Sequence, residues 1–378
     1  MRITDVRAFP TSFPIPPAQR VALGIGTAVK RDAVLVKVTT DEGITGWGEA
    51  HHGRAHTAVA KLIDTTLKQL VAGMDPLETT PAWERMYRFQ LASHGMGAGA
   101  CLAISGIDMA LWDIRGKAAG LPLYKLLGGA RKAIPAYAGG VSLGYQPSQQ
   151  LVEEAAKSLE QGYKAIKLRV GDSAVRDIER LRAVRRAFPE AILLTDANIG
   201  YTVEDARRVM PVMDELGIGW LEEPFPAHDY RSYREAKSFG RTPLAAGENH
   251  YTRFEFNRVI EDGAITILQP DLSKAGGITE ALRIAALASA WKLPVHPHSS
   301  MTGVNHAATI HFLAAIDNGG YFEGDVSRAN RFRDELVDNP GRVDRDGNVR
   351  PLEKPGIGLE VNEDFLLKHP PIEGPGYL

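Results

Sequence analysis

The chain has 378 residues, of which 44% are hydrophobic and 24% are charged, and its formal net charge is −2. This composition is typical of a globular protein with one large and one smaller domain. The near-neutral charge, without a basic block, argues against a nucleic acid or an anionic membrane as the main partner.

A single cysteine, Cys101, excludes an internal disulfide framework and fits a reducing compartment. The sequence opens without a secretory segment and contains no apolar run long enough to span a bilayer. We therefore expect a cytoplasmic protein whose partner is a small molecule, and we also expect a homo-oligomer.

The first 130 residues predict an α+β module. The stretch AVLVKVTTDEGITGWGE, residues 33–49, places alternating apolar positions on both sides of an Asp-Glu-Gly turn, which predicts a hairpin. The stretch CLAISGIDMALWDIRGKAAG, residues 101–120, has apolar residues at helical spacing. Gly120 and Pro122 are stop signals that end this predicted helix.

From about residue 134 the pattern changes to short apolar strands that alternate with amphipathic helices. The predicted strands include residues 164–170, 191–198 and 218–224, and the helices between them cover 174–188 and 203–217. Alternation of this kind predicts a parallel sheet.

Polar and titratable residues end the predicted strands at intervals of 23 to 29 residues: Lys167, Asp196, Glu222, Glu248, Asp271, His298 and Glu323. A single acidic residue at such a position is more often a helix N-cap or a solvated charge. The whole series is typical of a (β/α) barrel, whose active site is built at the carboxyl ends of several strands. We therefore expect these seven residues to converge.

Three members of the series, Asp196, Glu222 and Glu248, are carboxylates on consecutive predicted strands. They would repel one another strongly unless a cation lay among them. Carboxylate oxygens without cysteine or clustered histidine ligands suit Mg²⁺. We predict that these three residues are Mg²⁺ ligands.

Five motifs in this order, TDAN, LEEP, GEN, QPDLSKAGG and HPHSS, resemble the barrel of the enolase superfamily. They are most similar to its mandelate racemase subgroup, which contains many acid sugar dehydratases. The stretches GWGE and SGIDMALWDIRGKAAGLPLYKLLGG resemble the capping hairpin and the segment that leads into the barrel. The resemblance covers the whole chain.

This resemblance implies an α/β fold, a modified TIM barrel of the (β/α)7β type over residues 131–355. An α+β capping domain over residues 1–130, completed by residues 356–378, would close it. The family's shared step is removal of the proton α to a carboxylate by a Lys or His base working with Mg²⁺. We expect dehydration of an aldonate or aldarate to a 2-keto-3-deoxy acid, which would make the protein a lyase.

His298 is the best candidate for proton transfer, because imidazole titrates near neutrality. Asp271 resembles the family's partner that orients this ring. His296, two positions earlier, competes for the role, and we interpret it as structural. Lys167 supplies a cation for the negative charge of the intermediate.

The strand KAIKLRV places Lys167 and Arg169 on one face. In much of the family the second position is a lysine that acts as a base, whereas arginine stays protonated. Arg169 is therefore an anion binder or, equally, the partner of a neighbouring carboxylate.

One-base chemistry fits this site better than a two-base racemase does. In it, His298 removes the α proton and then protonates the departing hydroxyl, a syn elimination. Lys167 as base with His298 as acid, an anti elimination, stays open.

The remaining candidates bind substrate. Glu323 resembles the family's glutamate beside the substrate carboxylate and is otherwise a loop acid. Asn198 shares a strand face with Asp196 and is expected to contact a substrate hydroxyl or the metal's surroundings. In the capping module Arg20 and His51, with their neighbours His52 and Arg54, are substrate contacts or solvated surface groups.

Three other functions stay open. The first is an epimerase or racemase, and the second is a sugar-lactone cycloisomerase. The third is a non-catalytic sugar-acid binding protein, since fold alone does not establish activity. The stretch GMGAGA, residues 95–100, fits a dinucleotide fingerprint, but no buried strand is predicted before it, so a dehydrogenase receives little weight.

Overall fold

The computed structural model describes residues 1–299 and 301–378. Its N-terminal part contains an antiparallel sheet in the order β1-β4-β5, formed by Ile3–Pro14, Lys30–Thr40 and Thr45–Ala50. The last two strands are the predicted hairpin. Gly43 in its turn has a φ of 79°, a backbone conformation that glycine adopts without steric cost.

The long helix α4, Ala98–Ala119, packs on β4 and β5 of this sheet. Gly46 and Gly48 allow the close approach, because a β-carbon at either position would meet the backbone of α4 within 2.1 Å. The helix ends at Gly120 in the left-handed conformation, as its sequence predicted. The other elements of this part are η1 (Pro17–Gln19), β2 (Ala22–Leu23), β3 (Gly26–Thr27), α1 (His56–Leu62), η2 (Ile63–Leu67), α2 (Lys68–Val71), α3 (Thr79–Met86), η3 (Tyr87–Leu91) and α5 (Leu123–Leu126).

The second part is a curled parallel sheet in the order β11-β10-β9-β8-β7-β6-β12. Its strands are β6 (Ile134–Gly139), β7 (Ala165–Arg169), β8 (Ile192–Asp196), β9 (Leu221–Glu222), β10 (Leu244–Ala246), β11 (Ile267–Leu268) and β12 (Phe322–Asp325). Parallel bridges from Leu268 to Val295 and from Val295 to Gly319 join β11 to the segment that leads into β12. The sheet therefore closes on itself.

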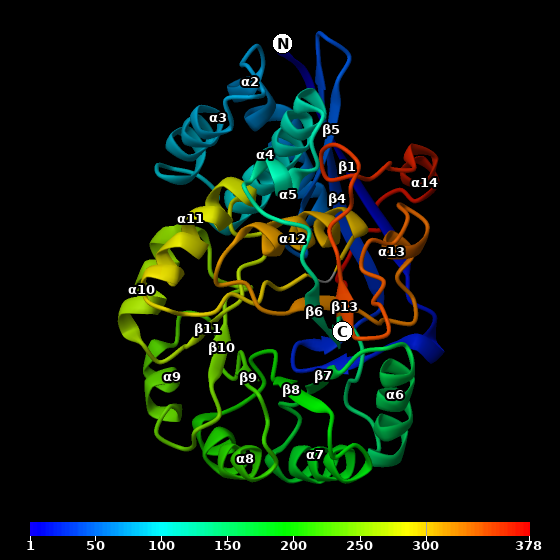
Figure 1. Ribbon diagram of the computed structural model, residues 1–378, viewed down its shortest axis with the longest axis vertical. Helices are drawn as coiled ribbons and strands as arrows, with labels where there is room; N and C mark the ends of the chain where they lie inside the picture. Colours follow the sequence, from blue (N-terminus) through cyan, green and yellow to red (C-terminus); the bar gives the residue numbers. More distant parts are fainter. Residues whose placement is uncertain (300) are drawn as a thin grey trace.

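Helices alternate with these strands and surround them (Figure 1). They are α6 (Ser148–Glu160), α7 (Ala174–Ala187), α8 (Val203–Glu215), α9 (Tyr230–Ala236), α10 (Thr252–Asp262), α11 (Gly277–Ala290) and α12 (Gly303–Ala315). With the extended segment at Val295 counted as a strand, the order is (β/α)7β, which confirms the predicted fold class. No helix in the described part of the chain combines the length and the apolar character that a membrane span needs.

The C-terminal segment returns to the N-terminal sheet, and Figure 1 shows α14 beside β1 and β4. The carbonyl of His369 accepts hydrogen bonds from Thr11 and from the amide of Ser12. At the end of the chain, Thr27 and Leu378 exchange two backbone hydrogen bonds. The remaining elements are α13 (Arg331–Asp334), β13 (Asn348–Val349), which pairs with β6, and α14 (Glu363–Lys368).

The interior of the barrel has an apolar layer below a polar one. The apolar layer comprises Tyr137, Ala165, Leu194, Trp220, Ala245 and Ile267. Lys167, Asp196 and Glu222 each follow a member of this layer by two positions and so share its inward face. The strand period therefore places charged groups directly above an apolar floor, at the carboxyl ends of the strands.

Candidate active site

A cavity of about 490 Å³ opens at the carboxyl ends of the barrel strands, between the barrel and the capping part. Seven residues that the sequence singled out line it: Arg169, Asn198, Glu248, His298, His51, His52 and Arg54. Five others are buried behind its wall, each at most 1% exposed: Lys167, Asp196, Glu222, Asp271 and Glu323. Strand-end residues that are far apart in sequence therefore come together at one site.

The side chains of His298 and Asp271 form a hydrogen bond of 2.6 Å between Nδ1 and Oδ2. The carboxylate is itself held in place, because its Oδ1 accepts hydrogen bonds from Ser273 and from Asn305. This arrangement fixes the ring of His298 and leaves its Nε2 directed into the cavity.

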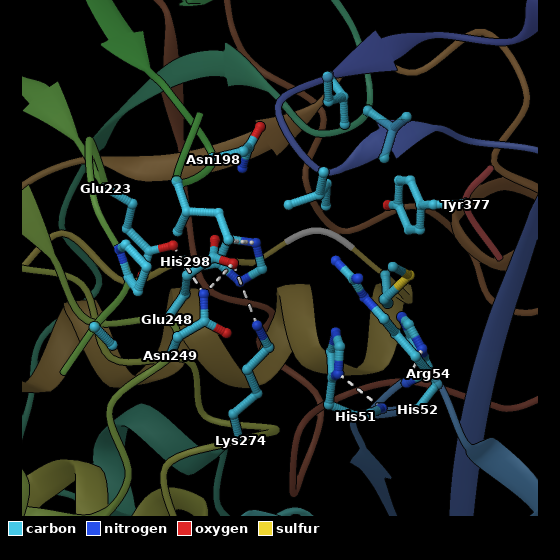
Figure 2. A pocket seen from close by; sticks show the side chains of 18 of the residues that line it. His51, His52, Arg54, Asn198, Glu223, Glu248, Asn249, Lys274, His298 and Tyr377 are labelled. Atoms are coloured by element: carbon cyan, nitrogen blue, oxygen red, sulfur yellow. Dashed lines mark hydrogen bonds and ion pairs between the residues drawn. The ribbon is translucent and has the colours of Figure 1, made fainter. Parts of the chain in front are cut away.

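Nε2 of His298 lies 3.1 Å from Oε2 of Glu248 (Figure 2). Burial lowers the pKa of the imidazole, but the carboxylates of Glu248 and Glu323 and the hydrogen bond to Asp271 outweigh it and raise the pKa to about 9. The other oxygen of Glu248 lies 3.4 Å from Nζ of Lys274.

Lys167 is fully buried among three carboxylates. Its Nζ lies 2.8 Å from Glu222, 3.1 Å from Glu323 and 3.3 Å from Asp196. Burial opposes the charge on Lys167, yet these carboxylates raise its pKa well above the ordinary value. The lysine is therefore a fixed cation in this arrangement.

Arg169 is the partner of a neighbouring carboxylate, which is one of the two roles the sequence allowed. Its Nη1 donates to Asp196 and, at 3.1 Å, to the side-chain oxygen of Asn198, while Nη2 donates to the carbonyl of Gly140. Its buried Nε has no hydrogen-bond partner in the described residues. The guanidinium also lines the cavity, so the anion-binding role stays compatible with its position.

The carboxylates predicted to bind Mg²⁺ are turned toward protein cations. Among the described residues, no three His, Cys, Asp or Glu side chains are arranged as a ready metal site. Glu222 accepts hydrogen bonds from Lys167 and, through its other oxygen, from Trp220 and Gln269.

The chemistry of this group nevertheless fits a hard divalent cation. The acidic groups Asp196, Glu222, Glu223, Glu248, Asp271 and Glu323 outnumber the cationic groups Lys167, Arg169, Lys274 and His298. Burial and the neighbouring carboxylates raise the pKa of Glu222 to about 7, against the opposing effect of Lys167. One buried oxygen of Glu223 accepts no hydrogen bond from the described residues. Oxygen ligands with excess negative charge are the environment that Mg²⁺ prefers.

Arg20 lies outside the cavity, so its position does not support the predicted contact with the same substrate. It follows the short turn η1 and directs its Nε toward the carbonyl of Ile15, at 3.4 Å. Arg20 lines a separate cavity of about 220 Å³.

His296 is structural, since its Nδ1 accepts a hydrogen bond from the amide of Tyr321 and its ring stacks on the tyrosine ring. Burial lowers its pKa to about 4.

Glu223, Lys274 and Tyr377 are among the residues that line the cavity and that sequence reasoning missed. Lys274 has a signal, since it lies three positions after Asp271 in QPDLSKAGG, and Glu223 adjoins Glu222 in LEEP. Tyr377 has no such sequence signal, because it reaches the cavity only through the return of the C-terminal segment.

The chain matches two families over most of its length. Residues 4–128 match the N-terminal domain of mandelate racemase and muconate lactonizing enzyme. Residues 150–365 match a family described as enolase C-terminal domain-like.

Curated relatives align along most of the chain. D-galactonate dehydratase of Variovorax paradoxus is 35% identical over 363 residues, which cover 89% of this chain and 92% of the relative. Arabinonate dehydratase of Saccharolobus solfataricus is 33% identical, with 96% and 97% covered. D-galactarolactone cycloisomerase of Agrobacterium fabrum is also 33% identical, with 89% and 91% covered.

Solved structures resemble this chain along nearly its whole length. A member of the enolase superfamily from Polaromonas sp. JS666 is 55% identical, with a TM-score of 0.97 and full coverage of both chains. A racemase from Streptomyces coelicolor A3(2) with bound magnesium is 29% identical, with a TM-score of 0.88 and coverage of 97% of this chain and 99% of that one. The chain belongs to the enolase superfamily, in its mandelate racemase subgroup.

Proposed function

We propose that this protein is a Mg²⁺-dependent sugar acid dehydratase, which converts an aldonate or aldarate to a 2-keto-3-deoxy acid. The observation that carries the proposal is the pair His298 and Asp271, joined at 2.6 Å beside a cluster of buried carboxylates and cations in one cavity. Dehydratases among the curated relatives support the reaction class.

In this proposal His298 accepts the α proton at Nε2, because Nδ1 is occupied by its hydrogen bond to Asp271. The carboxylate of Asp271 stabilises the imidazolium that forms. Nε2 must first separate from Glu248, which holds it at 3.1 Å, and lose the proton that the raised pKa of about 9 keeps on the ring at neutral pH. His298 then donates the same proton to the hydroxyl on the β carbon, which departs as water, and the resulting enol tautomerises to the ketone.

Negative charge develops on the substrate carboxylate as the α proton leaves. Lys167 is a buried cation at the base of the site and is placed to oppose that charge. Asp196, Glu222 and Glu248 would hold Mg²⁺, which when bound would supply Lewis-acid stabilisation of the same charge. Glu323 would position the substrate carboxylate, and Asn198 would bind a hydroxyl.

The one-base course is favoured over racemisation by the residue at position 169. A two-base racemase needs a second proton acceptor on the opposite face of the α carbon, and arginine stays protonated there. Lys167 as the base would require it to leave three carboxylates. We therefore place both proton transfers on His298.

A cycloisomerase or epimerase is the second candidate. One relative, named as a D-galactarolactone cycloisomerase, is 33% identical to this chain. That identity is close to the 35% of a relative named as a D-galactonate dehydratase. Both reactions begin with the same α-proton removal, so the site residues named above serve either outcome.

A screen of aldonic and aldaric acids with Mg²⁺ tests the proposal. Formation of a 2-keto acid is the expected result. Exchange of the α proton in D₂O without a 2-keto acid would assign the protein to the isomerases. Binding of an acid without either exchange or dehydration would show a non-catalytic binding protein.

A further inference from the structure

The polar side chains that line the cavity at the end of β5 present only hydrogen-bond donors to it. These side chains are His51, His52 and Arg54. Figure 2 shows them together on one side of the cavity, across from Asn198 and Glu223. Their protonation and pairing determine what this side can bind.

The backbone sets the tautomer of both imidazoles. The amide of Gly53 donates to Nδ1 of His51 at 3.1 Å, and the amide of Arg54 donates to Nδ1 of His52 at 2.9 Å. Since Nδ1 is the acceptor in each ring, the proton of the neutral imidazole lies on Nε2. No described residue accepts a hydrogen bond from either Nε2, so both N–H groups are available to a ligand.

Both rings also stay neutral. Their centroids are 4.1 Å apart, a separation at which two imidazolium ions would repel. Burial and the nearby positive charge of Lys274 hold the pKa of both rings well below the ordinary value. Each ring therefore presents one fixed donor at neutral pH and no acceptor.

Arg54 adds a full positive charge to the same surface. Its guanidinium lies 5.2 Å from the centroid of the Tyr377 ring, and it forms no ion pair with any described carboxylate. The carboxylates that line the cavity, Glu223 and Glu248, both belong to the barrel side. An unpaired guanidinium and two N–H donors without an acidic neighbour form a surface complementary to a carboxylate.

We propose that His51, His52 and Arg54 bind the second carboxylate of a sugar diacid, so that the protein prefers an aldarate to the matching aldonate. This inference rests on the proposed function, because it assumes that the first carboxylate binds beside Lys167. A cavity of about 490 Å³ lies in the range that accommodates a compact ligand. A terminal CH₂OH would offer the exposed guanidinium of Arg54 no charged partner, whereas a carboxylate would form a charge-assisted hydrogen bond with it.

Matched acids that differ only at the far carbon test the inference. The probes are gluconate against glucarate, galactonate against galactarate, and mannonate against mannarate, each titrated calorimetrically into the protein with Mg²⁺. We expect at least one diacid to bind about 10- to 100-fold more tightly than its monoacid, as charge-assisted hydrogen bonds predict. In Arg54→Gln this preference should fall to about threefold or less, with monoacid affinity little changed.

Arg88→Gln is the matched control, since Arg88 is an exposed capping-part arginine outside the cavity. It should keep the full preference for the diacid. Tighter binding of every monoacid, or a diacid preference that persists in Arg54→Gln, would overturn the inference. Turnover measured in parallel separates the two proposals. If Arg54→Gln loses the diacid preference but the unaltered protein forms no 2-keto acid, the result would support this inference and contradict the dehydratase.

Discussion

Oδ2 of Asp271 lies 2.6 Å from Nδ1 of His298, although 27 positions separate the two residues in the sequence. That separation is one strand-helix repeat of the barrel, so the contact joins the ends of neighbouring strands. The carboxylate is held by Ser273 and Asn305 and cannot rotate away without losing these hydrogen bonds. The ring orientation is therefore set by the scaffold before substrate binds.

Replacement of His298 should remove the chemistry. General acid-base groups contribute about 10²- to 10⁴-fold, and a histidine that acts in both proton transfers should lie at the upper end. His298→Asn should therefore abolish measurable dehydration and α-proton exchange, which NMR in D₂O would follow. His296→Asn is the matched control: it removes the hydrogen bond from Tyr321 and should lower the melting temperature with most turnover retained.

The exchange measurement also tests the order of proton transfers. Retained α-proton exchange in His298→Asn, with dehydration lost, would assign the base to Lys167. That result would contradict the one-base mechanism and leave His298 as the acid alone.

Metal removal should stop turnover. Asp196, Glu222 and Glu248 are proposed to hold Mg²⁺, so chelation should abolish activity and added Mg²⁺ should restore it. Glu248→Gln should weaken Mg²⁺ at least about tenfold, since even groups that only hydrogen-bond to a metal ligand contribute about 10- to 100-fold in affinity. Full activity in excess chelator would contradict the assignment.

Calorimetric Mg²⁺ titration and circular dichroism of Glu248→Gln separate metal loss from unfolding. The exposed Glu261→Gln, on α10, is the control for charge alone and should bind Mg²⁺ as the unaltered protein does.

The sequence predicted the fold and the strand-end residues of the site because both follow from local periodicity. Lys167, Asp196 and Glu222 lie two positions after apolar residues that face the barrel interior, and the strand period alone places them there. The contact of Asp271 with His298 was implied by the family resemblance, and the repeat length is consistent with it.

The pairing within the site and the capping contacts could not be predicted in this way. Whether Arg169 faces a ligand or Asp196 depends on side-chain rotamers, which the pattern of residue types does not encode. Arg20 directly follows a 3-10 turn and lines a separate cavity, a position that the residue pattern does not encode. Tyr377 reaches the cavity only because the chain end pairs with Thr27, a contact without sequence periodicity.

Glu49 should make stability depend on pH. It lies at the end of β5, fully buried, and accepts hydrogen bonds from the amide and hydroxyl of Thr302, while its other oxygen has no partner in the described residues. Burial raises its pKa from 4.5 to about 8 against these hydrogen bonds, and Asp271 contributes in the same direction. Between these two values the folded state keeps a proton that the unfolded state releases, so stability should fall as pH rises through that range.

Glu49→Gln keeps the acceptor for Thr302 and cannot ionise, so it should remove this decline. In urea unfolding, the stability of the variant relative to the unaltered protein should be about 4 kcal/mol higher at pH 8.5 than at pH 5. Glu84→Gln, at an exposed position of α3, should show no such difference. An effect of Glu49→Gln that is equal at both pH values would contradict the assignment of a protonated carboxyl.

Arg169→Lys distinguishes a ligand-binding arginine from a base. The guanidinium donates to Asp196 and to Asn198, and it lines the cavity. Lysine keeps the charge but loses the planar two-point contact, so KM should rise about 10- to 100-fold while kcat falls about threefold or less. Arg176→Lys, which alters an exposed two-point pair with Asp172, is the control and should leave both constants unchanged.

An unchanged KM with weakened Mg²⁺ binding would mean that Arg169 only orients Asp196. Loss of α-proton exchange with substrate still bound would make the residue part of the proton-transfer chemistry, and the one-base mechanism would then be wrong.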